Sequence, residues 1–289
     1  MTKTDEIEDS SAPLIEHLTE LRNRIMWCLL AFVIAMVICF TVWKPIFDFL
    51  KVPLCQAMMR TGDSNCDLVF ISLQEGFFMA FSISMMGGLV LAFPIISYQM
   101  WRFVAPGLYK TEKGAFLPFL VASPFMFFLG AVFAYYIVTP MAFDFFLSFQ
   151  EPTTIAEGPG DAATVPGGLI YQGSAQSYLS LTIKFVLAFG LCFQLPVLLT
   201  LMGTAGLISA AGLAGVRRYA VVAILILAAV ATPPDMMSQV ILFAAVYPLY
   251  EVSILLIRRI EKKREAKLRA EGLWFDEEAD DAADDVTKP

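Results

Sequence analysis

Six long apolar stretches dominate this chain of 289 residues and constrain its fold more than any other feature. A helix that crosses a bilayer needs roughly 20 mostly apolar residues, and stretches of about that length lie at 25–43, 73–97, 116–138, 178–203, 217–232 and 238–257. Hydrophobic residues make up 58% of the chain and charged residues only 16%, against roughly 25% charged residues in soluble domains. The sequence therefore predicts an all-α, polytopic membrane protein with six transmembrane helices.

The fifth stretch is the weakest of the six. Its apolar part, Tyr219 to Ala231, is short, and Thr232, Pro233 and Pro234 end it. Such a segment crosses a membrane where the bilayer thins locally or where neighbouring helices surround it.

Positive charges predict the direction of the chain. Six crossings place both termini on one side of the membrane, and the connections on that side carry Arg22, Arg24, Arg102, Lys110, Lys113, Arg217, Arg218 and the seven bases of 258–269. The opposite loops are poorer in bases, since 44–72 holds Lys44, Lys51 and Arg60 and 139–177 holds none. Because lysine and arginine accumulate in cytoplasmic loops, both termini are predicted to be cytoplasmic.

Composition also predicts where the membrane domain ends. Residues 1–258 contain all six stretches, whereas 259–289 begin with bases and then carry eight acids from Glu271 onward against one base, Lys288. A segment so rich in charge cannot bury an apolar core. We expect 259–289 to be a disordered cytoplasmic tail whose bases contact anionic lipid.

Several classes of function lack support in the sequence. The five cysteines have no C-x-x-C spacing and the only histidine is His17, which argues against a metal centre. No nucleotide-binding loop, dinucleotide fingerprint or hydrolase elbow occurs. The chain is therefore expected not to be an enzyme, to need no cofactor, to bind no nucleic acid and to draw energy from a membrane potential.

Two carboxylates stand near the cytoplasmic ends of apolar stretches. Glu20 lies on the polar face of a predicted amphipathic helix, Pro13 to Arg24, at the inner membrane surface, and Glu112 lies in a polar loop that begins at Tyr98. Together they are a candidate receptor for a cationic ligand. The alternatives are an i,i+4 pair of Glu20 with Arg24 and, for Glu112, a carboxylate that complements a helix dipole.

Polar residues inside the stretches are a second candidate group, because a bilayer penalises them unless they pair or face water. Lys184 is close enough to the outer end of its stretch to snorkel. Gln194 and Glu251 lie deeper and are candidates for contact with a partner helix. For Gln194, a hydrogen bond between the chain's own helices is the alternative.

The two external loops differ in kind. Loop 44–72 contains Pro53 and the apolar positions of a short interfacial helix, together with Cys55 and Cys66, which either form a disulfide or remain free thiols. Loop 139–177 is rich in glycine and proline from Gln150 to Gly173, which predicts an irregular segment.

Three motifs carry a resemblance to the TatC family, the multispanning receptor subunits of the twin-arginine protein translocase. They are His17-Leu18-Thr19-Glu20-Leu21-Arg22-Asn23-Arg24, the run Phe103 to Glu112 with Pro106 at its centre, and Thr232-Pro233-Pro234-Asp235 with Ser238-Gln239. With the six-stretch pattern, the resemblance covers nearly the whole chain to about Arg258.

The resemblance implies a glove-shaped bundle in the bacterial inner membrane that receives the twin-arginine signal peptides of folded cargo. It implies that Glu20 and Glu112 hold the arginine pair, with Phe103 nearby and Arg22 shaping the site, and that Pro53, Pro106 and Asp235 order loops. It also implies single-span partners of the TatA and TatB type that dock near Thr232, Gln239 and Gln194, in a larger complex with more than one copy of this chain.

The chain departs from the family pattern at two places, where Gln194 stands in place of a common glutamate and Ser174 in place of a common acid. The rival interpretation is a secondary transporter for a small solute, which requires a cavity near the membrane midplane built by broken helices.

Overall fold

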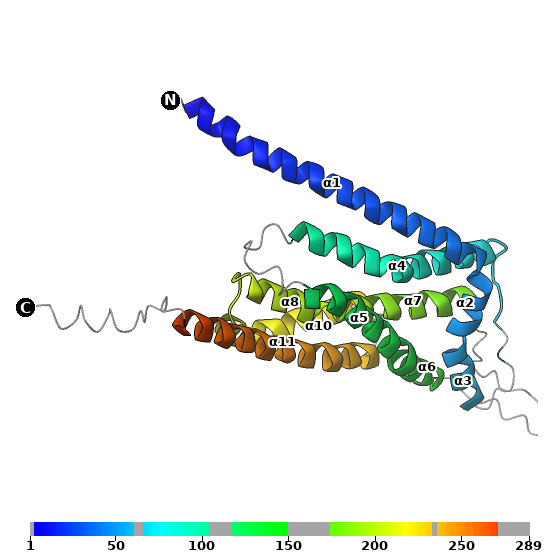
Figure 1. Cartoon of the computed structure of the whole chain (residues 1–289). Helices are drawn as coiled ribbons and strands as arrows, with labels where there is room; N and C mark the ends of the chain where they lie inside the picture. Colours follow the sequence, from blue (N-terminus) through cyan, green and yellow to red (C-terminus); the bar gives the residue numbers. More distant parts are fainter. Residues whose placement is uncertain are drawn as a thin grey trace, which may run out of the picture.

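The computed structural model describes residues 3–60, 66, 68–104, 117–149, 174–232 and 236–270, and in this part of the chain every named element is a helix (Figure 1). The elements are α1 (Lys3–Thr41), α2 (Trp43–Leu50), α3 (Val52–Arg60), α4 (Glu75–Val104), α5 (Leu117–Phe133), η3 (Ala134–Val138), α6 (Thr139–Leu147), α7 (Ala175–Cys192), α8 (Leu195–Thr204), α9 (Ala210–Gly215), α10 (Arg217–Ala231) and α11 (Met236–Ala270). The predicted all-α class is confirmed.

Five of the apolar stretches form helices that are long and apolar enough to cross a membrane: Leu18–Thr41, Glu75–Phe103, Pro118–Leu147, Ala175–Thr204 and Met236–Lys267. The fifth stretch forms α10, which has 15 residues. At about 1.5 Å per residue it measures roughly 22 Å, short of the roughly 30 Å hydrocarbon core. The weakness seen in the sequence is thus a real difference in length.

Two expected boundaries fall elsewhere in the structure. The amphipathic segment from Pro13 to Arg24 is continuous with the first apolar stretch in α1, since no proline or glycine interrupts the chain between them. The polar loop expected from Tyr98 begins later, because α4 runs to Val104.

Prolines shape the third and fourth spans. In the third, Pro140 cannot donate a helical hydrogen bond, and the turn before it is the π-helix η3, where Thr139 Oγ1 donates to Ala134 O at 2.8 Å. The helix then continues as α6 to Leu147, so residues 139–147, which were predicted to begin the external loop 139–177, extend the third helix. In the fourth span Pro196 separates α7 from α8 at Phe193 and Gln194.

The expected tail also differs from the structure. Helix α11 passes without a break through the boundary predicted at residue 258 and ends at Ala270. Lysine, arginine, glutamate and alanine are strong helix formers, so the basic segment extends the helix instead of forming a disordered start. The acidic residues from Glu271 lie outside the described residues.

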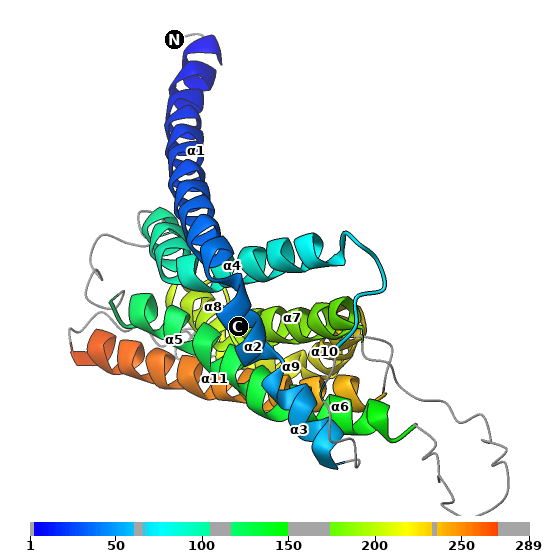
Figure 2. The same ribbon diagram turned by 90° about the vertical axis from the view of Figure 1, so that its right-hand side faces the viewer.

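The helices pack unevenly around the bundle. Only 11% of the most apolar part of α1 is buried, against 56% for the span that α7 and α8 form. Helix α1 lies along α4, where a Cβ on Gly88 would come within 2.8 Å of Met36 Cα, so glycine permits the close approach. Figures 1 and 2 show the N-terminal half of α1 leaning away from the other helices.

Candidate functional site

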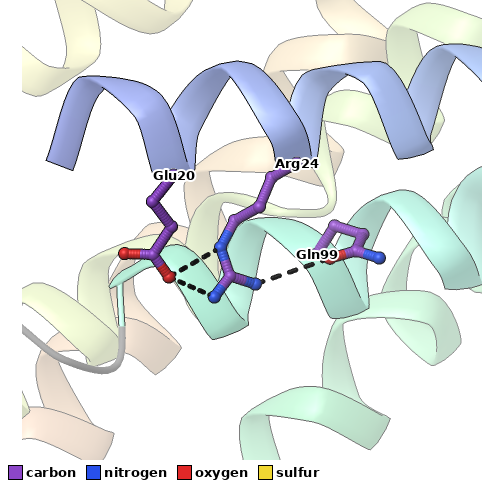
Figure 3. A network of polar contacts seen from close by, with 3 residues as sticks. All are labelled: Glu20, Arg24 and Gln99. Atoms are coloured by element: carbon purple, nitrogen blue, oxygen red, sulfur yellow. Dashed lines mark hydrogen bonds and ion pairs between the residues drawn. The ribbon is translucent and has the colours of Figure 1, made fainter. Parts of the chain in front are cut away.

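Glu20 and Arg24 lie on the same face of α1, and both point toward the C-terminal part of α4 (Figure 3). Arg24 Nε donates to Glu20 Oε1 at 3.1 Å, and Arg24 Nη2 forms an ion pair with the same oxygen. The third nitrogen, Nη1, reaches Gln99 Oε1 on α4 at 3.5 Å. The i,i+4 pair offered by the sequence is therefore confirmed, and Arg24 also contacts a second span through Gln99.

Exposure within this pair is unequal. The Arg24 side chain is 14% exposed and the Glu20 side chain 37% exposed. An exposed pair of this kind stabilises a helix by only about 0.3–0.5 kcal/mol. Both bonds from Arg24 go to Glu20 Oε1, and Glu20 is the more exposed residue of the pair, so a ligand can approach its carboxylate from solvent.

The end of α4 is held firmly beneath this pair. Trp101 is buried against Val197 and Leu201 of α8, and its ring lies 6.0 Å from that of Phe119 on α5. Phe103 follows on the next turn after Gln99 and is partly buried, whereas Arg22 on α1 is exposed. The anchoring by Trp101 fixes where the segment that follows α4 leaves the bundle.

The remaining residues expected at this site lie outside the described residues. Glu112 and Pro106 belong to the segment 105–116 between α4 and α5, and Asp235 belongs to 233–235 between α10 and α11. Their placement relative to Glu20 and Gln239 stays a prediction.

Gln194 makes hydrogen bonds within the chain. It lies at the break between α7 and α8, where its Nε2 donates to Ser123 O at 2.8 Å and its Oε1 accepts from Ser123 Oγ at 2.9 Å. Ser97 Oγ on α4 lies 3.3 Å from Ser123 Oγ. The structure thus contains the intrachain alternative, and docking of a partner at Gln194 would have to compete with these bonds.

The other proposed docking residues lie near the paired ends of α10 and α11. Thr232 is buried and its Oγ1 donates to Ala228 O at 2.8 Å, which closes the last turn of α10. Gln239 is partly buried in the first turn of α11, next to the fully buried Ser238. A partner would meet Gln239 more readily than Thr232.

Pro53 and the two loop cysteines lie at the opposite end of the bundle. Pro53 is buried in the first turn of α3, where a missing N–H costs no hydrogen bond. Cys55 and Cys66 form a disulfide with their Cα atoms 5.3 Å apart. In the structure this loop is therefore a pair of helices, α2 and α3, closed by a covalent bond.

Gln99 and Ser123 are the site residues that the sequence analysis missed. Each contacts a partner far away in the sequence, 75 residues for Gln99 with Arg24 and 71 residues for Ser123 with Gln194. For Ser123, a polar side chain inside an apolar stretch was the available signal, since such groups pair when they are buried. Gln99 was assigned to the polar loop that was predicted to begin at Tyr98. Among the described residues, no group of three or more His, Cys, Asp and Glu side chains is arranged to hold a metal ion.

These features define a class: a multispanning helical membrane protein whose half-exposed carboxylate is held by arginine at one end of the bundle. Comparison with known proteins narrows the class. Residues 16–244 match the model of the family TatC, Sec-independent protein translocase protein. The chain is 41% identical over 283 residues to the Sec-independent protein translocase protein TatC of Magnetococcus marinus, covering 97% of both chains.

Two further comparisons agree. The TatC protein of Aquifex aeolicus is 36% identical over 252 residues, which is 87% of this chain and 97% of that protein. A crystal structure of the twin arginine translocase receptor TatC superimposes with a TM-score of 0.67 at 35% identity, covering 84% of this chain and 98% of the crystallised one. The chain belongs to the TatC family, and the rival interpretation as a small-solute transporter is not favoured.

Proposed function

We propose that this protein is the signal-peptide receptor and core subunit of a twin-arginine translocase that exports folded proteins. The observation that carries the proposal is the half-exposed Glu20 carboxylate, oriented by Arg24 and joined through Gln99 to the firmly anchored end of α4. The crystallised relative is itself a twin arginine translocase receptor, which supports the same assignment.

Carboxylates at this end suit an arginine pair in particular. A guanidinium presents a planar fork of donors that two carboxylate oxygens accept together, whereas a lysine ammonium is a point charge without that geometry. Arg24 contacts Glu20 Oε1 with two of its nitrogens, so a guanidinium of the ligand meets a carboxylate whose orientation is fixed. Orientation before binding lowers the entropy that binding costs.

A second acid completes the proposed receptor. Glu112 follows the last described residue of α4, Val104, by eight residues, which extend over at most about 26–29 Å. Since Gln99 of the same helix contacts Arg24, Glu112 lies within reach of the Glu20 site. Phe103 and Arg22 flank the site from α4 and α1, as the family resemblance implies.

The proposal includes a topology and partners. Six crossings with both termini in the cytoplasm follow from the distribution of lysine and arginine, with α10 as a short fifth span where the bilayer thins locally. The proposed membrane is the bacterial inner membrane, with Glu20 at its cytoplasmic face. Single-span translocase subunits then dock beside α10 and α11, near Thr232 and Gln239.

Peptide binding to purified protein in lipid nanodiscs tests the proposal. A twin-arginine signal peptide should bind the unmodified chain more tightly than the same peptide with two lysines. Glu20→Ala and Glu112→Ala should each lower the affinity by about 2–5 kcal/mol, and Glu→Gln at the same positions by less, because an acceptor survives.

Asp144→Ala is a matched control, because Asp144 is an acid of the opposite end whose ion pair with Arg60 is exposed. Its peptide affinity should equal that of the unmodified chain. An affinity that stays within about twofold after both glutamates are replaced, a change below about 0.5 kcal/mol, would show that these acids do not form the receptor.

A further inference from the structure

The outward face of α7 is unlike the outward faces of α1 and α10. Helix α7 directs large side chains, Tyr178, Phe185 and Phe189 among them, into the bundle core. The opposite face carries Ser177, Ser180 and Lys184 in exposed positions. A helix with large apolar residues inside and small or charged residues outside is poorly suited to face lipid alone.

Exposed side chains elsewhere make the contrast clear. On α1, large apolar side chains face outward along the whole span, as Leu29, Val33 and Val37 illustrate, and α10 does the same with Val222, Ile226 and Val230. On α7 the first exposed large apolar residue is Leu191, near its C-terminal end. The N-terminal three-quarters of α7 thus lacks the apolar surface that its neighbours offer to lipid.

Lys184 carries the charge of this face. Its Cα lies nine residues after Ala175, which is about 13–14 Å along the helix. The span Ala175–Thr204 has 30 residues and is about 45 Å long, so a centred hydrocarbon core of roughly 30 Å encloses Lys184. Within the described part of the chain, Lys184 Nζ makes no ion pair with a carboxylate.

The spacing of the outward positions is that of a helix-packing seam. Ser177, Ser180, Lys184, Ala188 and Leu191 follow one another at intervals of three, four, four and three residues. This heptad-like pattern gives left-handed packing at a crossing angle near +20°. Small residues along such a seam let a second backbone approach closely in a membrane.

We propose that this seam of α7, defined by those five residues, receives a transmembrane helix of a partner subunit that carries an aspartate or glutamate at the depth of Lys184. A carboxylate there offsets the cost of the buried ammonium, and Ser177 and Ser180 supply both room and hydroxyl groups for interhelical hydrogen bonds. The seam lies on a different helix from Thr232 and Gln239. The inference rests on the proposed function only in that the chain works with other membrane subunits.

Synthetic single-span peptides test the seam on the full chain in nanodiscs. One leucine–alanine peptide carries a glutamate nine residues from the end that lies beside the N-terminus of α7, and its twin carries glutamine there. Energy transfer between labelled protein and labelled peptide reports the affinity. The glutamate peptide should bind about threefold to tenfold more tightly than the glutamine peptide, which is the range of single polar contacts in membranes.

Three variants test whether the preference for the glutamate peptide over the glutamine peptide depends on the seam. Lys184→Leu should abolish the preference for glutamate, Lys184→Arg should keep it, and Ser180→Leu should weaken both peptides by blocking close approach. Phe125→Leu, at an exposed apolar position of α5, is the matched control and should change nothing.

Equal binding of the two peptides to the unmodified chain would overturn the inference, and it is the result expected if Lys184 only snorkels to a lipid phosphate. A glutamate preference that survives in Lys184→Leu would overturn it as well. Signal-peptide affinity measured on the same samples keeps the two proposals apart, since a lost glutamate preference with normal signal-peptide binding contradicts the seam alone.

Discussion

The two ends of helix α1 are held to the rest of this bundle to very different degrees. At one end, which we call the cap, α2 and α3 lie across the ends of α6 and α7 (Figure 2). The disulfide Cys55–Cys66 closes the cap, and Arg60 Nη1 of α3 pairs with Asp144 Oδ2 of α6 at 3.0 Å. Two tyrosines also donate hydrogen bonds to backbone carbonyls at the end of α2: Tyr135 donates to Phe49 O at 2.6 Å, and Tyr178 donates to Leu50 O.

At the other end, which we call the open end, the N-terminal half of α1 leans away from the bundle (Figure 1). One side-chain hydrogen bond that joins α1 to α4 there is the contact of Arg24 with Gln99, and it is long at 3.5 Å. Ion pairs that are partly exposed contribute little to stability. Elsewhere at the open end, polar contacts join α9, α10 and α11: Arg217 Nη2 pairs with Glu251 Oε2 at 2.8 Å, and Ala210 N donates to Glu261 Oε1 at 2.9 Å.

This difference matches the demands of the proposed receptor. Elements that admit a ligand come from the less stable parts of a fold, whereas a scaffold must be rigid to position them. In this chain the disulfide lies in the cap, and the candidate ligand-binding carboxylate lies at the open end, on the half of α1 that leans away from the bundle. Changes in the cap should therefore lower stability, and changes at the open end should lower binding.

The largest effect on stability is expected from the cap disulfide. Replacing Cys55 and Cys66 by serine removes a cross-link over a sequence separation of 11 residues, and should lower the free energy of unfolding by about 2–3 kcal/mol. Chemical denaturation in detergent micelles measures this loss. Signal-peptide affinity should stay unchanged, because Glu20 lies at the other end.

Cys28→Ser is the control, since Cys28 on α1 is a free thiol and its loss breaks no cross-link. Mass spectrometry should find Cys55 and Cys66 protected from alkylation until a reductant is added. Alkylation of both without reduction would contradict the bonded cap.

A smaller effect is expected from Gln194, which lies between the two ends. Gln194→Leu removes two hydrogen bonds to Ser123 and should cost about 0.6–1.7 kcal/mol of stability. Because Ser123 is the hydrogen-bond partner of Gln194, Ser123→Ala should cause little further loss of stability in the Gln194→Leu background. A double-mutant cycle should therefore show energetic coupling between the two positions.

The cycle also separates the two interpretations of Gln194. If this amide docks a partner helix, Gln194→Leu should reduce copurification of single-span subunits and show no coupling to Ser123. Gln239→Leu is the matched comparison, because Gln239 is partly buried near the start of α11 and is a proposed docking residue. Loss of subunits in Gln239→Leu but not in Gln194→Leu would favour a structural role for Gln194.

Local sequence patterns predicted much of this arrangement. The apolar stretches located five long spans and showed that α10 is the short one, because length and hydropathy are local properties. The pair of Glu20 with Arg24 could also be predicted from the sequence, since residues four apart share a helix face. The predicted C-terminal ends of the stretches 73–97 and 116–138 lie several residues before the ends of the helices. Helix α4 continues to Val104, and the third span continues past Pro140, through a π-helical turn, to Leu147.

Local sequence patterns could not predict the contacts between helices. Nothing near Arg24 in the sequence indicates Gln99, and nothing near Gln194 indicates Ser123, because both pairings depend on how distant spans pack. At the basic end of α11 the sequence-based prediction differs from the structure for another reason. Its charge suggested a disordered tail, yet its helix-forming residues continue the preceding span, so local propensity prevailed over composition.

The smallest effects on stability, and the sharpest comparison of the two ends, should come from one arginine at each end. Arg60→Ala breaks an ion pair whose side chains are 64% and 42% exposed, and Arg24→Ala breaks the pair with Glu20. Each should change the free energy of unfolding by at most about 0.5 kcal/mol. Arg60→Ala should leave signal-peptide affinity unchanged.

Arg24→Ala should behave differently in the binding measurement, because it releases the Glu20 carboxylate from the orientation that Arg24 and Gln99 impose. We expect about a threefold loss of affinity for the twin-arginine peptide, roughly 0.65 kcal/mol, with partial rescue in Arg24→Lys, since an ammonium keeps one contact to Oε1. A competing role predicts the opposite sign: if Arg24 merely occupies the place of a signal-peptide arginine, its removal should tighten binding. An affinity that rises in Arg24→Ala would therefore identify Arg24 as a competitor of the ligand, and a loss that lysine partly restores would identify it as the residue that positions Glu20.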